Sequence, residues 1–156
     1  MNNVTYCKSW FRAKKSATQI WDNNTAREAH ESRKPYTVLV GDPDRPHCFI
    51  EINNDFVGVC FLDDNLRENL TYQFQEIEKG RLFLSMATYR DFDGATDTVK
   101  SGTSYMFGQD GSIQIRKESF NPHNLEVSDT QGDVSGNYEQ YPEFGDYSSI
   151  AVADRG

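Results

Sequence analysis

Hydrophobic and polar positions alternate along the middle of this chain in short runs, and each run ends at a turn sequence. Alternation with a period of two is typical of β-strands that bury one face. Turn sequences such as Gly41–Pro46 and Gly108–Gly111 keep the connections short, and short connections join neighbouring strands in antiparallel order. The pattern predicts a curved antiparallel β-meander of about six or seven strands within residues 36–117. Its runs are Tyr36–Val40, Cys48–Ile52, Phe56–Leu62, Leu70–Ile77, Arg81–Arg90, Thr103–Phe107 and Ser112–Arg116.

The segment before the meander shows a different spacing. Between Ser9 and Ser32 the apolar residues recur at helical intervals, namely Trp10, Ala13, Ala17, Ile20 and Trp21, and Pro35 closes the segment. This spacing predicts one helix, or two helices joined at Asn23. The expected fold class is therefore α+β, with a helical segment in residues 1–35 packed on the meander.

The segment after the meander, residues 118–156, is rich in glycine and proline and predicts a loop-rich tail. Aromatic residues recur in it at every third position, namely Tyr138, Tyr141, Phe144 and Tyr147. Ile150–Val152 predicts a short final strand. We expect the tail to wrap around the sheet, so that residues 1–156 form one domain.

Charge divides the chain into two parts. Residues 1–35 hold seven Lys or Arg and three acids, a charge of +4, whereas residues 36–156 hold nine and twenty-one, a charge of −12, so the total is −8. Such an acidic body repels nucleic acid and anionic membrane, and it attracts basic proteins over roughly a Debye length, about 8 Å at physiological salt. The charge predicts a basic protein partner, and no nucleic-acid or membrane partner.

The cysteines and the N-terminal sequence bear on the compartment. Cys7, Cys48 and Cys60 are odd in number and widely spaced, which argues against a disulfide framework. The N-terminus has no continuous apolar stretch typical of a signal peptide, and nowhere do about eighteen apolar residues follow one another. The sequence predicts a cytoplasmic protein.

No motif for catalysis, cofactor binding or metal binding stands out. Nucleotide-binding glycine motifs and a nucleophile elbow are missing from the sequence. Asp91, Asp93 and Asp97 surround Gly94, but the glycine and the acids do not have the spacing of a calcium-binding loop. His30, His47 and His123 are scattered. We therefore expect no catalytic residue, no metal and no cofactor.

Two groups of residues are candidates for contact with a partner. Aromatic anchors ringed by carboxylates are typical of recognition surfaces, because rings bury a large area and carboxylates bind Lys or Arg. The alternative for the tail is that its rings face inward and fasten it to its own sheet. The candidate contacts are Asp91, Asp93 and Asp97 in one loop, with Tyr138, Glu139, Tyr141, Glu143, Phe144 and Asp146 in the tail.

In general character the chain resembles bacterial immunity proteins, which neutralise toxins delivered between competing cells. The resemblance lies in a short acidic β protein without a catalytic motif, and in the stretches Arg81–Phe92 and Asp133–Tyr147. It implies a mechanism in which an acidic face binds a basic toxin, such as a nuclease, and covers its active site. The alternative is a small-molecule-binding protein or hydrolase, with Phe83, Tyr89 and Tyr105 lining a pocket in the curved sheet.

Overall fold

A computed structural model describes residues 3–154 of the chain, and nearly all regular structure in this part is β. The elements are β1 (Val4–Phe11), β2 (Ser16–Trp21), α1 (Asn23–Glu31), β3 (Tyr36–Asp42), β4 (Arg45–Ile52), β5 (Phe56–Leu62), β6 (Glu68–Glu78), β7 (Arg81–Phe92), β8 (Val99–Phe107), β9 (Ser112–Ser119), β10 (Asn124–Gln131), a 3₁₀ turn (Ser135–Asn137) and β11 (Tyr138–Gln140). No helix among these residues has the length and apolarity needed to cross a membrane.

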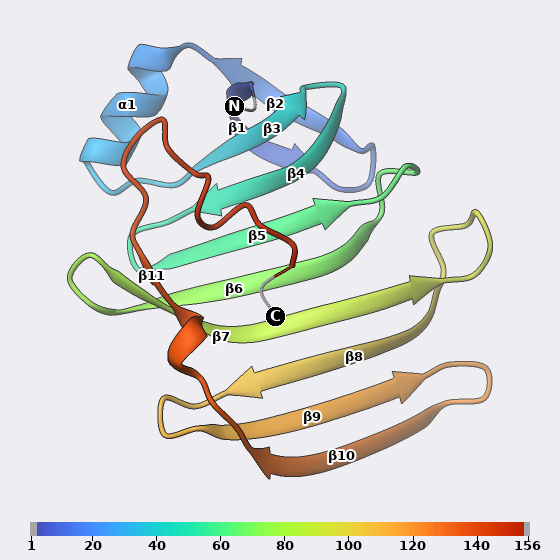
Figure 1. The fold of residues 1–156 in the computed structure, drawn as a ribbon. Coiled ribbons are helices and arrows are strands. Elements are labelled where there is room, and N and C mark those ends of the chain that lie inside the picture. The colour runs from blue at the N-terminus through green and yellow to red at the C-terminus, as the bar shows by residue number, and fades with distance from the viewer. Residues whose placement is uncertain (1–2, 155–156) are drawn as a thin grey trace.

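All strands of the described chain belong to one curved antiparallel sheet (Figure 1). The strand order is β10-β9-β8-β7-β6-β5-β4-β3-β1-β2, and β11 pairs with the beginning of β7. Strand accounts for 57% of the described residues and helix for 8%. The predicted antiparallel sheet is confirmed, whereas the predicted α+β class with a six- or seven-stranded meander is wrong, because both flanking segments add strands.

The N-terminal segment forms a β-hairpin where a helix was predicted. Its apolar spacing matches the register of the hairpin, since Trp10 lies opposite Ala17 and Cys7 lies opposite Ile20. Trp10 and Ala17 are seven residues apart, which is about two turns of an α-helix. Their spacing therefore fits a helix as well as it fits this hairpin. Within residues 3–154, α-helix is limited to α1, where the Asp22 side chain accepts a hydrogen bond from the Thr25 N–H and caps the first turn.

The sheet has two differently covered faces. On the covered face, α1 and the tail pack over a core that includes Val38, Ile50, Val59, Tyr72 and Ala87, which lie side by side on β3 to β7. On the opposite face, which we call the hairpin face, the outer part of the β1–β2 hairpin folds back over β3 to β5. There Trp10 stacks on Phe49 with ring centroids 5.5 Å apart.

The tail crosses the covered face from β10 towards α1 and then returns to the middle of the sheet (Figure 1). Its residues Tyr147 and Ile150 are buried against the sheet. Two predictions for this region are wrong. Asn124–Gln131 forms strand β10 where a loop-rich tail was expected, and Ile150–Val152 lies in turns, because Ile150 is buried in the core and not paired in the sheet.

Candidate functional site

Three turns at one end of the sheet, together with the strand ends beside them, carry seven aspartates. The turns join β3 to β4, β5 to β6 and β7 to β8, and they lie on the same side because these six strands are neighbours in an up-and-down order (Figure 1). Six of the aspartates are exposed and Asp63 is half-buried. We call this surface the aspartate end. It consists of Asp42, Asp44, Asp63, Asp64, Asp91, Asp93 and Asp97.

Turn chemistry explains why aspartates occur here. The Asp42 carboxylate accepts a hydrogen bond from the Asp44 N–H at 2.9 Å, and the Asp63 carboxylate accepts one from the Asn65 N–H at 2.9 Å. A carboxylate that bonds the backbone two residues onward stabilises a tight turn. The same bonds fix the position of the carboxylates, so that the turns hold their charges in place.

Cationic side chains link the three turns to one another. The Arg67 guanidinium donates to the Asp63 carboxylate at 2.8 Å and to the carbonyls of Gly94 and Thr96 at 2.8 Å each, which joins the β5–β6 and β7–β8 turns. The Arg67 guanidinium also lies 4.7 Å from the centre of the Phe92 ring. Arg45 donates to the carbonyl of Asp64 and so joins the β3–β4 turn to the β5–β6 turn.

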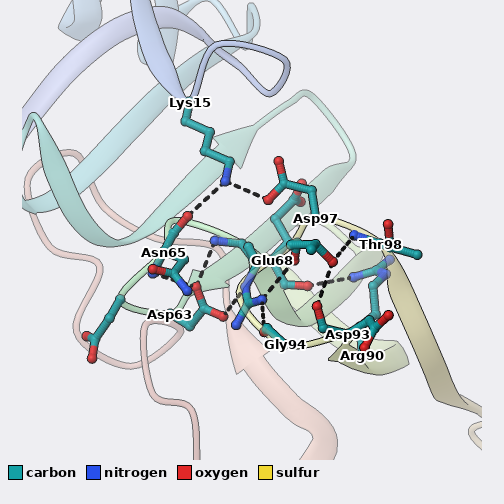
Figure 2. Close-up of polar contacts among 12 residues, drawn as sticks. Lys15, Asp63, Asn65, Glu68, Arg90, Asp93, Gly94, Asp97 and Thr98 are labelled. Carbon is teal, nitrogen blue, oxygen red and sulfur yellow. Dashed lines mark hydrogen bonds and ion pairs between the residues drawn. The ribbon is translucent and has the colours of Figure 1, made fainter.

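The tip of the β1–β2 hairpin adds a further link. Lys15 reaches between two turns and donates to the Asn65 carbonyl at 2.9 Å and to the Asp97 carboxylate at 2.7 Å (Figure 2). Since β1 and β2 are far from β7 in the strand order, this contact depends on the hairpin folding back over the hairpin face.

The local bonds set the charge of Asp63. Partial burial by itself raises the pKa of this carboxyl, but the hydrogen bonds from the N–H groups of Arg67 and Asn65 and from the Arg67 side chain outweigh it. The pKa of Asp63 therefore lies below its ordinary value, and the carboxylate stays ionised at neutral pH.

Most of the exposed aspartates form no ion pair in the described chain. Within residues 3–154, no ion pair reaches Asp42, Asp44, Asp64, Asp91 or Asp93. The aspartate end therefore presents a concentrated negative charge on turns that are cross-linked and shaped in advance.

The nine candidate contacts predicted from the sequence fall into two separate places. Asp91, Asp93 and Asp97 lie together at the aspartate end. The six tail residues lie elsewhere, since Tyr138 pairs with Phe83 near the start of β7, eight residues before Asp91. At about 3.3 Å per residue this is a separation of roughly 25 Å along the strand. The structure thus does not bring the two groups into one patch.

The tail rings contact their own chain. The Tyr141 hydroxyl donates to the Asn53 carbonyl at 2.7 Å, and the Phe144 ring stacks on Tyr6 with centroids 4.9 Å apart. Tyr138 lies against Phe83 at 5.1 Å. The alternative in which the rings fasten the tail to its own sheet matches these contacts.

The tail carboxylates differ from the rings. Glu143 and Asp146 are exposed, and Asp146 accepts a hydrogen bond from the Ser148 hydroxyl at 2.8 Å. Glu139 lies half-buried in β11. Contact of these residues with a partner stays a prediction.

A polar cavity of about 440 Å³ lies on the hairpin face under the hairpin tip. Arg12 closes one side, where its guanidinium donates to the carboxylates of Glu51 and Glu68 at 3.0 Å each. Arg90 lines the cavity from β7 and donates to the Thr71 hydroxyl at 3.1 Å, and no carboxylate pairs with it among the described residues. The Gln73 side-chain amide also lines the cavity and makes no hydrogen bond within residues 3–154.

The alternative function, a small-molecule-binding protein or hydrolase, predicted one pocket lined by Phe83, Tyr89 and Tyr105, and these three residues do not line the same cavity. Tyr105 lines a trough of about 490 Å³ on the covered face, to which neither Phe83 nor Tyr89 contributes. Phe83 is buried against Tyr138, and Tyr89 is exposed.

Histidines and cysteines form no reactive group in the described chain. His47 packs beside Gly41, and His123 bonds Glu118 at 2.7 Å on the exposed β9–β10 turn. Burial raises the pKa of the Cys7 thiol to about 11 and that of Cys48 to about 12, so both are protonated at neutral pH. Within residues 3–154, no three His, Cys, Asp or Glu side chains lie close enough together to hold a metal ion.

Comparison of the chain with models of protein families, with curated proteins and with solved structures finds no match.

The sequence interpretation missed the residues that organise this site. In the sequence, four of these residues are recognisable only as positive charges, because their roles depend on contacts with other elements of the fold. They are Arg12, Lys15, Arg45 and Arg67. One signal was present for the hairpin: Ser16–Trp21 contains Thr18 and Ile20 at alternate positions, and Lys14-Lys15 precedes it as a polar turn.

Proposed function

We propose that this protein acts by stoichiometric binding of a basic protein and that it neutralises a toxin in the manner of bacterial immunity proteins. The observation that carries the proposal is the aspartate end, where six exposed aspartates stand on three cross-linked turns. The three buried free thiols are compatible with a reducing cytoplasm.

Rigid carboxylates suit the binding of a cationic cleft. Charges that are already positioned lose little conformational freedom on binding, and complementary charge speeds association and excludes wrong partners. A toxin that acts on nucleic acid needs a cationic active site. A cluster of carboxylates can occupy such a site and keep the substrate out.

The proposal is tested with the purified protein and the product of the gene beside its own. Reversal of one charge, Asp93→Lys, is expected to weaken the complex by roughly tenfold or more, because it places a cation against a cationic surface. Asp93 is exposed and unpaired within the described residues, so the variant is expected to fold normally.

Glu143→Lys is the matched comparison, since Glu143 is an exposed acid in the tail. A partner that binds at the aspartate end alone keeps its affinity for this variant, whereas a partner that also contacts the predicted tail residues loses affinity. Affinity that falls only with Glu143→Lys places the interface on the tail. A complex that is insensitive to both variants and to added salt contradicts the proposal.

The cavity on the hairpin face favours a second candidate function, the binding of a small organic anion. Arg90 has no carboxylate partner in the described chain and bonds the Thr71 hydroxyl, and the Gln73 amide lines the same cavity. A guanidinium with neighbouring hydrogen-bonding groups is suited to a carboxylate or phosphate.

A panel of small carboxylates and phosphates tests this second candidate by thermal denaturation. A ligand of the cavity is expected to raise the melting temperature of the protein and of Arg90→Lys, but not of Arg90→Ala. Equal shifts in all three proteins contradict binding at Arg90.

A further inference from the structure

The sheet ends in two edge strands, β2 and β10, and they differ in how well they are protected. An edge strand exposes a row of backbone N–H and C=O groups that another chain can pair with. Natural sheets block such edges with short or bent strands, prolines, lysines or bulges. The β2 edge has six residues and is distorted at Gln19, whose φ is 39°.

The β10 edge has none of these protections. It pairs with β9 over all eight residues, Asn124–Gln131, without a break in register, and it contains no proline and no lysine. All eight residues are exposed. No hydrogen bond other than the ladder with β9 reaches its backbone within the described chain. On an antiparallel edge every second residue turns its N–H and C=O outward, so about four residues are open to pairing.

The chain closes a comparable opening elsewhere with its own strand. Strand β8 pairs with β7 only from Met86 onward, which leaves the first residues of β7 without a neighbour on that side. There β11 pairs with Arg81 to Phe83 and fills the gap. The same tail starts directly after β10, yet it leaves the outer side of β10 open (Figure 1).

Side chains next to this edge offer apolar contacts. Leu125 and Val127 are 39% and 52% exposed and lie on one face of β10. On the other face the small residues Ser128 and Thr130 lead to the trough lined by Ile113 and Ile115. An added strand could thus bury long apolar side chains at alternate positions.

Charge indicates which strand fits. The ionisable residues of β10 are Glu126 and Asp129, while Arg116, Lys117 and Glu118 lie one strand inward on β9. Pairing of two copies through their β10 strands brings together two strands that each carry two acids and no Lys or Arg. Like charges on neighbouring strands repel each other, whereas opposite charges attract. A strand rich in Lys or Arg avoids this repulsion.

We infer that β10 is a docking edge that takes up an extended, lysine- or arginine-rich segment of another protein as an additional antiparallel strand. This surface is separate from the aspartate end and goes beyond the proposed function, since it needs no toxin and no aspartate of the turns.

The probe is a synthetic eight-residue peptide in which lysine alternates with valine, and the control peptide has glutamate in place of lysine. Amide hydrogen exchange of the full chain is measured by NMR with each peptide. The lysine peptide is expected to slow exchange of the outward amides of β10 by roughly tenfold, and the glutamate peptide is expected to leave them unchanged.

Two variants locate the effect. The double variant Glu126→Lys/Asp129→Lys changes only exposed side chains and is expected to lose protection by the lysine peptide. Asp93→Lys, at the aspartate end, is expected to keep the protection of β10 by the lysine peptide. The two proposals can therefore fail independently, since this variant tests only binding at the aspartate end. The inference is overturned if the lysine peptide leaves amide exchange in β10 unchanged. It is also overturned if the peptide slows amide exchange in β2 to the same extent. Sedimentation that shows dimers of the chain, abolished by the double variant, overturns it in favour of a second copy.

Discussion

At the scale of single residues, Arg33 shows how the tail is held. Its guanidinium donates to both carboxylate oxygens of Glu76, at 3.0 and 3.2 Å, and lies 3.8 Å from the centre of the Tyr141 ring. Glu76 also accepts the Gly80 N–H at 2.7 Å. Arg33 thus joins the segment after α1, strand β6 and the tail, and the two-pronged bond to a partly buried carboxylate is a strong one.

These bonds make stability depend on pH. Burial raises the pKa of Glu76, but the bonds from Arg33 and Gly80 outweigh it, so the folded pKa lies below the ordinary 4.5. A depressed folded pKa gives stability that is present above the unfolded pKa and is lost as the pH falls through the folded pKa. Glu76→Gln is expected to lower the free energy of unfolding at pH 7 by about 1.5–3 kcal/mol.

Urea denaturation at several pH values measures this effect. The difference between the protein and Glu76→Gln is expected to shrink as the pH falls below 4.5. Glu78→Gln is the control, because Glu78 is exposed at the end of the same strand. A difference that stays constant with pH is inconsistent with the Arg33 pairing.

At the scale of elements, local alternation predicted strands well and the N-terminal hairpin badly. Each of the seven predicted runs lies within an observed strand. In β6 buried positions alternate with a period of two, whereas β3 and β5 are short apolar runs buried on both faces. In the hairpin, Trp10 and Ala17 have a spacing that fits a helix equally well, and only their packing on Phe49 and Leu39 decides between the two. Strand β10 is exposed along its whole length, so burial leaves little pattern in its sequence.

The hairpin makes a specific prediction about neighbouring residues. Trp10 is 4% exposed and Phe11 is 45% exposed. Trp10→Ala is expected to lower the free energy of unfolding by about 3–5 kcal/mol, because it leaves a cavity over Phe49. Phe11→Ala is expected to change it by less than about 0.5 kcal/mol. Equal losses in the two variants, measured by denaturant unfolding, argue against the hairpin.

At the scale of the whole molecule, the β10 edge lies apart from the other two candidate sites. The cavity under the hairpin adjoins the aspartate end, because Asp97 belongs to that end and also lines the cavity. The sequence predicted Asp91, Asp93 and Asp97 as contacts, because the loop itself is rich in acid. It could not predict the junction of this loop with Lys15 and Arg67, since those pairs depend on strand order and on the fold-back of the hairpin.

We propose that a partner binds at the aspartate end, and hydrogen–deuterium exchange of the protein alone and in its complex with the neighbouring gene product tests this. Exchange is expected to slow in the turns at residues 41–45, 63–67 and 92–98. Protection confined to the tail, residues 135–147, with these turns unchanged, would contradict it.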